Sequence, residues 1–263
     1  MTKSKASEPE FGNWISKKMI FSFGVGSIIL FILTLISIFN FRLSFTILIG
    51  LLFLFFLVSF VYFCYAHNAF SERGDNIQNK IYDLVFEYIG FNEIGKIIDI
   101  GCGNGELTIK LAKKYSNAKL FGIDYWGGMW GYSEKNCIAN AKLEGVDKQI
   151  EFKQASASLL PYNDNTFDLA ISNFVFHEVK DTKNKKDLIK EALRVLKPGG
   201  SFVIQDLFLS SFYYGNIDDL MNEIKSWGIK EIKFVDTSKS TFIPMALKLP
   251  FMIGKIGIIY GEK

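Results

Sequence analysis

Arginine, histidine and cysteine are scarce in this sequence of 263 residues. Arginine occurs only at Arg42, Arg73 and Arg194, and the sequence has only two histidines and three cysteines. Because the cysteines lie far apart and form no Cys-x-x-Cys pair, neither a disulfide framework nor a structural zinc site is expected. The formal net charge is only +3, which gives no strong electrostatic attraction to nucleic acid.

The sequence is nevertheless more apolar than an ordinary soluble domain, with 49% hydrophobic residues and a mean hydropathy of +0.18. Between Lys18 and Arg42 there is no charged residue, and none follows Arg42 until Glu72. Residues 19–39 and 45–66 each reach the length of about 20 apolar residues that a helix needs to cross a bilayer. The short connection between them, residues 40–44, predicts a two-helix transmembrane hairpin.

Two other interpretations of these apolar segments fit the sequence less well. One is a buried hairpin in the core of a soluble protein. The other is a cleaved signal peptide, but its apolar region would be shorter, and no small-residue cleavage site precedes the second span. Lys17 and Lys18 precede the first span, and Arg73 and Lys80 follow the second. By the positive-inside rule we expect a two-pass protein of the cell membrane, with both termini and the domain that follows in the cytoplasm.

From Arg73 onward, predicted strands and helices alternate along the chain. Strands are predicted over residues 96–100, 119–123, 150–154, 167–172, 201–207, 229–235 and 256–260. Helices are predicted over residues 77–88, 105–115, 133–144, from 181 or 182 to 196, and 217–227. This alternation predicts an α/β, doubly wound, Rossmann-like fold with a mostly parallel sheet of seven strands. The chain then comprises a tail (1–18), the hairpin (19–66), a linker with a leading helix (67–95) and the main domain (96–263).

A glycine-rich turn follows the first predicted strand, in the run DIGCGNG of residues 99–105. In such sheets ligands bind at the carboxyl ends of the strands, and glycines let backbone amides approach them closely. The second strand ends at Asp124, where a carboxylate can accept hydrogen bonds from two ribose hydroxyls. Glu106 stands where a dinucleotide-binding fingerprint needs its third glycine, and Asp99 instead suits a ligand with a cationic amino group.

Four segments resemble the motifs of class I S-adenosylmethionine (SAM)-dependent methyltransferases, in the order in which that family has them. They are IDIGCGNG of residues 98–105, FGID of residues 121–124, LPYNDNTFD of residues 160–168 and RVLKPGG of residues 194–200. Within the family they are most similar to the ubiquinone/menaquinone-biosynthesis type, and the similarity does not extend to the hairpin. The resemblance implies SAM as the cofactor and methyl transfer as the reaction.

The resemblance also implies which residues hold the cofactor. Asp99 would act at the methionine end of the site, and Gly101 and Gly103 would line the methionine and ribose. Asp124 would hold the ribose hydroxyls, and Tyr125 would pack on the adenine. The remaining residues expected in the cofactor site are Cys102, Ser156, Ala157 and Asn173.

One position departs from the family pattern. Where many relatives have an acidic residue that contacts the adenine amine, this chain has Ser156. A hydroxyl can still accept that hydrogen bond but carries no charge, so one expectation is weaker binding of the cofactor.

Two polar side chains after the fourth and fifth strands are candidates for contact with the substrate. His177 is a candidate general base, although it could equally orient a loop beside the cofactor. Asp206 could meet the substrate or simply cap its strand. Because methyl transfer is an in-line displacement on an activated sulfonium, positioning alone can supply most of the catalysis, and no metal is expected.

Two apolar regions have open interpretations. The aromatic residues after the second strand could form a wall against adenine or substrate, or a lid packed on the sheet; they are Tyr125, Trp126, Trp130 and Tyr132. The segment 241–254 could touch the bilayer, cap a tunnel for a hydrophobic substrate, or pack over the end of the sheet.

Together these features predict a membrane-anchored SAM-dependent methyltransferase with a small lipophilic acceptor, such as a quinone precursor, an isoprenoid or a lipid. Residues 19–66 would contact the lipid bilayer and raise the local concentration of such an acceptor. The main alternative is a non-catalytic SAM-binding membrane sensor or scaffold, and a more remote one is a nicotinamide-dependent oxidoreductase. A near-neutral domain without a basic stripe argues against a nucleic-acid partner.

Overall fold

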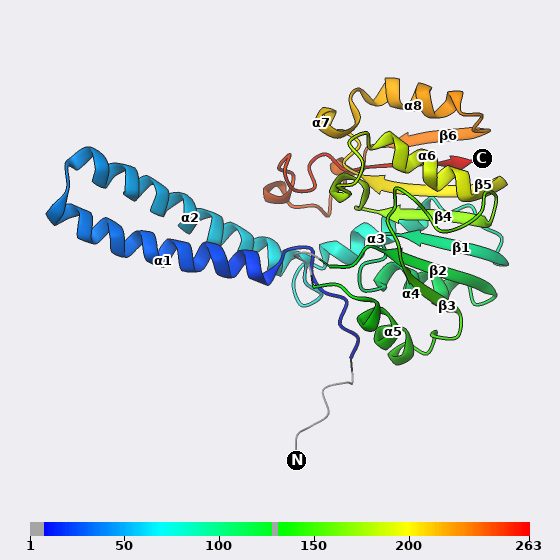
Figure 1. The fold of residues 1–263 in the computed structure, drawn as a ribbon, viewed down its shortest axis with the longest axis horizontal. Helices are drawn as coiled ribbons and strands as arrows, with labels where there is room; N and C mark the ends of the chain where they lie inside the picture. Colours follow the sequence, from blue (N-terminus) through cyan, green and yellow to red (C-terminus); the bar gives the residue numbers. More distant parts are fainter. Residues whose placement is uncertain (1–7, 128–130) are drawn as a thin grey trace, which may run out of the picture. The chain divides into compact units, whose positions relative to one another are not determined.

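The computed structural model describes residues 8–127 and 131–263, and the chain divides into two compact units. One unit comprises residues 13–80, and the other comprises the segment up to Gly12 together with Ile81–Lys263 (Figure 1). The first unit contains the two long apolar helices, and the second contains the sheet.

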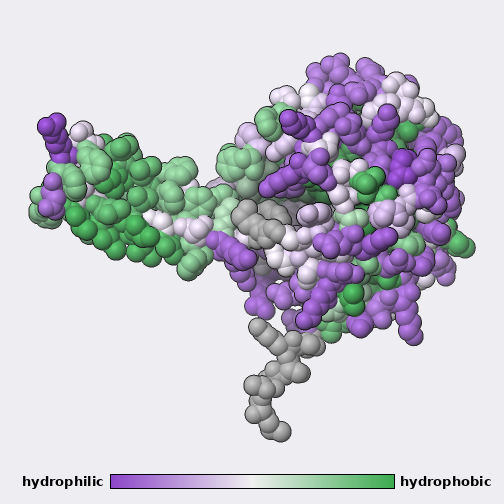
Figure 2. Space-filling model, in the orientation of Figure 1, coloured by the Kyte–Doolittle hydropathy of each residue, from purple (hydrophilic) through white to green (hydrophobic). Residues whose placement is uncertain are grey.

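The helices of the first unit are α1 (Lys17–Asn40) and α2 (Leu43–Phe70). Both are long and apolar enough to cross a membrane, and almost none of their apolar stretch is buried within the protein. Figure 2 shows that hydrophobic residues cover their visible surface. The turn between them consists of Phe41 and Arg42, which is shorter than the expected connection because both helices extend beyond the predicted apolar spans.

The distribution of polar and apolar side chains in α1 is inverted relative to a soluble protein. Its buried residues are Ser27 and Ser37, whose hydroxyls donate to backbone carbonyls within the helix, whereas large apolar side chains are exposed. The two helices pack through aromatic rings, and a Cβ at Gly26 would lie 2.5 Å from the ring of Phe56. Gly26 is therefore explained by the close approach of the two helices.

The sheet of the second unit has seven strands in the order β3-β2-β1-β4-β5-β7-β6. The strands are β1 (Gly95–Ile100), β2 (Ala118–Asp124), β3 (Ile150–Gln154), β4 (Phe167–Asn173), β5 (Leu196–Asp206), β6 (Glu231–Val235) and β7 (Gly257–Glu262). The first five run parallel, and β7 is antiparallel to both β5 and β6. The predicted mostly parallel, Rossmann-like sheet is thus confirmed, and its strand order reverses between β1 and β4, where ligands bind in such folds.

Helices cover both faces of the sheet. They are α3 (Ile77–Glu87), α4 (Glu106–Lys114), α5 (Glu134–Leu143), α6 (Lys186–Val195), α7 (Ser211–Tyr214) and α8 (Ile217–Ser226). The short 3₁₀ turns are η1 (Phe176–Glu178), η2 (Thr237–Lys239) and η3 (Met245–Leu247). Because side chains alternate along a strand, Ile97 of β1 belongs to the core beneath α3 and α4, while Ile98 belongs to the core beneath α6 and α8.

Two predicted boundaries are wrong. The helix expected from residue 181 or 182 begins at Lys186, because the Asn184 side chain accepts a hydrogen bond from the Lys186 backbone N–H (3.3 Å) and ends the preceding turn. Strand β5 begins at Leu196 and not near residue 201, because Gly199 N donates to Lys263 O (2.8 Å) and continues the pairing with the C-terminal strand.

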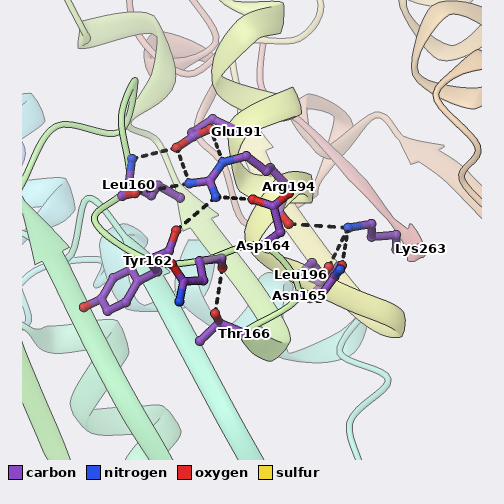
Figure 3. A network of polar contacts seen from close by, with 10 residues as sticks. Leu160, Tyr162, Asp164, Asn165, Thr166, Glu191, Arg194, Leu196 and Lys263 are labelled. Atoms are coloured by element: carbon purple, nitrogen blue, oxygen red, sulfur yellow. Dashed lines mark hydrogen bonds and ion pairs between the residues drawn. The ribbon is translucent and has the colours of Figure 1, made fainter.

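Arg194 joins two of the family-like segments to each other, as Figure 3 shows. Its Nη1 donates to Tyr162 O (2.9 Å) and to Asp164 Oδ1 (2.6 Å), and its Nη2 donates to Glu191 Oε1 (2.8 Å). The same Glu191 oxygen accepts the backbone N–H of Leu160 (2.7 Å). The hydrogen bonds of Arg194 therefore stabilise the fold of the domain. The resemblance of these two segments to the family reflects this structural role and not a catalytic one.

The segment 241–254 between β6 and β7 presents apolar side chains in both directions. Ile243, Leu247 and Ile253 are buried, whereas Met245 and Phe251 are exposed. Part of this segment thus packs on the domain, and part is available to an apolar surface.

Candidate active site

The glycine-rich turn after β1 is held tightly against the end of β2. The backbone N–H groups of Gly101 and Cys102 both donate to Ile123 O, at 2.7 and 2.9 Å. Gly101 has a φ of +82°, and a Cβ there would lie 2.2 Å from a methyl carbon of Val175. Only glycine fits this position, so the turn can bring its backbone amides to the carboxyl edge of the sheet.

Asp124, at the end of β2, faces this turn. Its Oδ2 accepts the Gly103 backbone N–H (2.9 Å) and its Oδ1 accepts the Trp126 backbone N–H (2.8 Å). Burial raises the pKa of Asp124 above its usual value, and the backbone N–H groups oppose that rise. The carboxylate is therefore fixed in place with acceptor lone pairs remaining on both oxygens.

The aromatic residues after β2 differ in placement. Trp126 is buried, and its Nε1 donates to Gly103 O (2.8 Å), whereas Tyr125 is 73% exposed. Cys102 and Cys137 are buried against Trp126, and Tyr132 packs on the same cluster. Trp126 and Tyr132 thus form a lid on the glycine-rich turn, while the predicted member Trp130 lies outside the described residues.

Asp99, on β1, is only 2% exposed. Thr108 Oγ1 donates to its Oδ2 at 2.5 Å. Burial raises the pKa of Asp99 to about 7, although the Thr108 hydrogen bond opposes the rise. A buried carboxyl with this pKa gains stability from a cationic partner, which is what an amino group of a ligand would provide.

A segment near the N-terminus crosses the same turn, which the sequence did not predict. Asn140 of α5 accepts the Glu10 N–H (2.9 Å) on its Oδ1 and donates to Glu10 O (3.1 Å) through its Nδ2. Asn104 Nδ2 also donates to Glu10 O (3.2 Å), and Gly12 lies against the Tyr132 ring. We call residues 8–12 the strap; no motif marks it, because its partners are roughly a hundred residues away in sequence.

The loop after β3 lies beside the end of β2, since Ala155 N donates to Asp124 O (3.0 Å). Ser156 follows and is partly exposed, and its hydroxyl lies 2.5 Å from Asp181 Oδ2. Ala157 is buried and belongs to the core cluster under α6. The loop therefore places the Ser156 hydroxyl beside the Asp181 carboxylate, directly after the backbone contact of Ala155 with the end of β2.

Asn173 ends β4 and is 8% exposed. Neither its Nδ2 nor its Oδ1 has a hydrogen-bond partner among residues 8–127 and 131–263. A buried amide without partners costs roughly 1–3 kcal/mol, so a side chain in this position is expected to bind a ligand or an ordered water. The neighbouring Ser172 is different, because its hydroxyl donates to Ile100 O (2.9 Å).

His177 and Asp206, which are 29 positions apart in sequence, form a buried pair. The Nδ1 of His177 lies 2.5 Å from Asp206 Oδ1, and Asp206 Oδ2 accepts the His177 backbone N–H (3.1 Å). Leu207 N also donates to the carboxylate (2.6 Å) and fixes it. Burial alone lowers the pKa of His177, but the Asp206 carboxylate outweighs this effect, so the pKa lies above its usual value. With the Nδ1 proton directed at Asp206, Nε2 is the nitrogen that can accept a proton.

A cavity of about 410 Å³ adjoins this pair. It is lined by His177, Glu178, Val179, Lys180, Thr182, Lys183, Lys185, Phe212 and Tyr213. Lys185 is buried, and its ammonium donates to the carbonyls of Val179 and Thr182. Three lysines and two aromatic rings thus surround one end of the cavity, which suits an acceptor with both apolar and electron-rich parts.

The structure brings most of the predicted site residues to the carboxyl edge of the sheet. Asp99, Gly101, Gly103 and Asp124 meet at the ends of β1 and β2, and His177 with Asp206 adjoins the end of β4. Tyr125 follows Asp124, but its side chain is exposed, and its carbonyl accepts a hydrogen bond from Gln154 Nε2 (2.7 Å). Lys185 was not predicted as a site residue, because a buried lysine has no characteristic motif.

These residues fit SAM on three observations. The glycine-rich turn leaves no room for a side chain beside its backbone, the buried Asp99 and the half-buried Asp124 offer carboxylate acceptors beside it, and the Asn173 amide lacks a partner within the described chain. The donors and acceptors of the site thus match a ligand with cationic and hydroxyl groups.

Comparison with known proteins supports this fit. The family described as "Methyltransferase domain" matches residues 98–204. A demethylmenaquinone methyltransferase of Lactococcus lactis is 29% identical over 177 residues, which are 63% of this chain and 66% of that protein. The enzyme of the same name from Bacillus mycoides is 29% identical over 62% of this chain and 69% of that protein. The chain thus spans about two thirds of the length of these relatives.

Two solved structures have a similar fold. Geranyl diphosphate C-methyltransferase from Streptomyces coelicolor has a TM-score of 0.55 at 13% identity, over 71% of this chain and 78% of that one. The [4+2]-cyclase SpnF has a TM-score of 0.53 at 20% identity, over 70% of this chain and 81% of that one. At these identities the structures establish the fold and not the reaction.

The matched domain, the seven-stranded sheet and the identity with named methyltransferases agree with the site geometry. The chain is therefore a SAM-dependent methyltransferase that is similar to the demethylmenaquinone methyltransferases of the menaquinone/ubiquinone-biosynthesis type, and SAM is its cofactor.

Proposed function

We propose that the chain is a membrane-anchored methyltransferase that transfers the methyl group of SAM to a small, lipophilic, quinone-related acceptor. The observation that carries this proposal is the His177–Asp206 pair after β4 and at the end of β5, where His177 lines a cavity. The curated relatives named as demethylmenaquinone methyltransferases support a quinone-related acceptor.

Membrane anchoring is supported by the surface of α1 and α2. Their large apolar side chains are exposed along most of both helices, while Ser27 and Ser37 are buried. Exposing this much apolar surface to water is unfavourable, and a helix that is apolar on all sides belongs in a core or a bilayer. The basic residues that flank the hairpin, Lys17 and Lys18 before it and Arg73 after it, favour a cytoplasmic location for the methyltransferase domain.

The geometry at the ends of β1 to β4 supports the cofactor assignments that the family resemblance implies. Asp99 pairs with the amino group of the methionine part, and Asp124 accepts the ribose hydroxyls. The backbone of Gly101 and Gly103 lines the methionine and ribose, and Asn173 provides the unpaired amide for the cofactor or the acceptor. The other residues assigned to the cofactor site are Cys102, Tyr125, Ser156 and Ala157.

SAM supplies a methyl group on a positively charged sulfur, which is already activated for displacement. The acceptor is held in the cavity with its hydroxyl or acidic C–H directed at His177 Nε2. As the acceptor atom bonds the methyl carbon and the carbon–sulfur bond breaks, His177 takes the acceptor's proton. Asp206 stabilises the imidazolium that results, and general-base assistance of this kind typically contributes a factor of about 10² to 10⁴ in rate.

The cavity and its surroundings support a lipophilic acceptor whose reactive oxygen gains negative charge. Phe212 and Tyr213 offer aromatic contact, and the buried ammonium of Lys185 lies close enough to His177 to lower its pKa slightly against the effect of Asp206. Phe212, which lines the cavity, is exposed and offers apolar surface there. The Leu209 N–H donates to Lys255 O (3.0 Å) and ties the segment before α7 to the segment before β7.

A non-catalytic SAM-binding sensor or scaffold is the alternative. The observation that favours it is the uncharged Ser156, which replaces the acidic residue of many relatives. It predicts that the chain binds S-adenosylhomocysteine (SAH) without transferring a methyl group.

The test is transfer of labelled methyl from SAM in membranes that contain the full-length chain, followed by separation into organic and aqueous phases. We expect label in the organic phase, lost in Asp124→Ala and retained in Asp147→Ala, which changes an exposed aspartate away from the site. Label confined to the aqueous phase would overturn the lipophilic acceptor. SAH binding with no transfer of label would favour the sensor or scaffold.

A further inference from the structure

A carboxylate lies behind Ser156 although the sequence motif lacks one. Ser156 Oγ lies 2.5 Å from Asp181 Oδ2, and Ser158 Oγ lies 2.7 Å from the same oxygen. The backbone N–H of Ser158 donates to Ser156 Oγ (3.2 Å). Two serines from the loop after β3 therefore share one carboxylate that comes from a segment 25 positions further along the chain.

The segment that carries Asp181 is fixed by a buried cation. It lies between η1 and α6, and the ammonium of Lys185 donates to the carbonyls of Val179 and Thr182 on either side of Asp181. The Ser156 hydrogen bond lowers the pKa of Asp181 below its usual value, and Ser158 and the nearby Lys185 add to the effect. Asp181 is therefore an anion at neutral pH, and it accepts the hydroxyl protons of both serines.

The position of Ser156 places this group where the adenine would lie. Asp124 ends β2, the loop after β3 follows it through the hydrogen bond from Ala155 N to Asp124 O (3.0 Å), and Ser156 comes next. A nucleoside whose ribose is held by Asp124 extends its base along the carboxyl edge of the sheet. On this side of the sheet the loop after β3 is the nearest neighbour of that base.

The hydrogen bonds decide which ligand groups Ser156 can recognise. A hydroxyl has one proton and two lone pairs. The proton of Ser156 is directed at Asp181, and one lone pair is used by the Ser158 N–H. Ser158 Oγ lies 2.9 Å from Ser156 Oγ, but its own proton is directed at the same Asp181 oxygen. The remaining lone pair can only accept a hydrogen bond, and the ionised partner makes it a better acceptor than an isolated hydroxyl.

We propose that Asp181, acting through Ser156, selects the amino group of the cofactor's adenine over a carbonyl at the same position. Ser156 and Asp181 together thus replace the acidic residue that is missing from the motif. The inference rests on the proposed cofactor site. Asp181 is a positioning residue, because it fixes the direction of the Ser156 proton and need not touch the ligand.

The test compares the binding of SAH with that of S-inosylhomocysteine, in which an oxygen replaces the adenine amine, by calorimetry on the full-length chain. The wild-type chain should prefer SAH. In Asp181→Ala the Ser156 proton is free to turn toward the oxygen, so the preference should fall about tenfold, because one hydrogen bond changes from unfavourable to favourable. Asp147→Ala, which removes an exposed aspartate elsewhere, should leave the preference unchanged.

A second variant separates recognition from structure. Adding Ser156→Asp to Asp181→Ala places a carboxylate directly at the loop and should restore the preference for SAH. If Asp181→Ala weakens both ligands equally, or if Ser156→Asp does not restore the preference, Asp181 only supports the loop and the inference is wrong. If the wild-type chain binds neither ligand, the proposed cofactor site itself fails, which is a different result.

Discussion

The site has two halves that differ in how the protein completes their hydrogen bonding. In the cofactor half, at the ends of β1 and β2, Asp99 accepts from Thr108 and Asp124 accepts from two backbone N–H groups. In the acceptor half, at the ends of β4 and β5, His177 is fixed by Asp206 on one nitrogen and adjoins a cavity with the rest of its ring. Under the proposed function, the first half binds the cofactor and the second moves a proton.

If the two halves have these separate roles, substitutions in them should affect different measurements. Changes in the cofactor half should alter SAH affinity, and changes in the acceptor half should alter the rate at saturating SAM. The predictions that follow test this separation in order of expected effect.

The largest effect is expected for His177→Ala. Without Nε2 the acceptor has no base in the cavity, so kcat should fall by a factor of about 10² or more. SAH affinity should stay within about twofold, because the ring does not belong to the cofactor half. The measurements are methyl-transfer kinetics and SAH calorimetry, and Asp147→Ala, which changes an exposed aspartate away from the site, is the control.

The pH profile provides a further check on this pair. The base must be neutral, so the rate should rise with pH through a pKa above the usual value for histidine. Asp206→Asn removes the charge that raises this pKa, and the rising limb should move to lower pH. A rate in His177→Ala close to the wild-type rate would mean that positioning alone supplies the catalysis.

The second prediction concerns Asp99 and has an expected effect of about tenfold. With a pKa of about 7, the ionised fraction of Asp99 increases about tenfold between pH 6 and pH 8. Because the cationic amino group of the ligand needs the ionised form, SAH affinity should rise by the same factor. Calorimetry at several pH values should show this rise in the wild-type chain and none in Asp99→Asn.

Stability should depend on pH in the opposite sense. The pKa of Asp99 is higher in the folded chain than in the unfolded one, so the folded state holds the extra proton between about pH 4 and pH 7. The contribution of Asp99 to the free energy of unfolding therefore decreases as pH rises from about 4 to about 7. At pH 8, Asp99→Asn should be at least as stable as the wild-type chain to heat, although it binds SAH poorly. A less stable Asp99→Asn would contradict the buried, ionised carboxyl.

The same two halves explain why the sequence predicted one of them better. A turn that requires positive φ can be recognised from glycines at fixed spacing, and a strand that ends in Asp124 shows the second carboxylate directly. These signals are local, so the fold and the cofactor strands followed from short motifs. The helix boundary near Lys186 was missed because the Asn184 side chain accepts the Lys186 backbone N–H and competes with the start of the helix.

The acceptor half brings together residues that are far apart in the sequence. His177 and Asp206 were each predicted as single candidates, and neither the pairing nor the cavity could be derived without knowing that β4 and β5 are neighbours. The contact between Ser156 and Asp181 has the same origin, since it joins loops that follow different strands. Similarly, no pattern near Glu10 indicated a contact with α5.

Substitutions in the strap are expected to have the smallest effect on SAH affinity. They also give the most selective test of the comparison between the two halves of the site. Its main contact with α5 uses the backbone N–H of Glu10, which donates to Asn140 Oδ1. Glu10→Pro removes that N–H and leaves a buried acceptor without its partner, whereas Glu10→Ala keeps the N–H and serves as the matched control. We expect SAH affinity to fall about fivefold in Glu10→Pro, the equivalent of one net hydrogen bond of about 1 kcal/mol.

Because the strap contacts Asn104 and Asn140 in the cofactor half, the KM for the acceptor should remain unchanged in Glu10→Pro. An equal loss in Glu10→Ala would assign the effect to the side chain and not to the backbone contact. A change in the acceptor KM without a change in SAH affinity would place the strap's influence in the acceptor half, and the two halves would then not be separable by substitution.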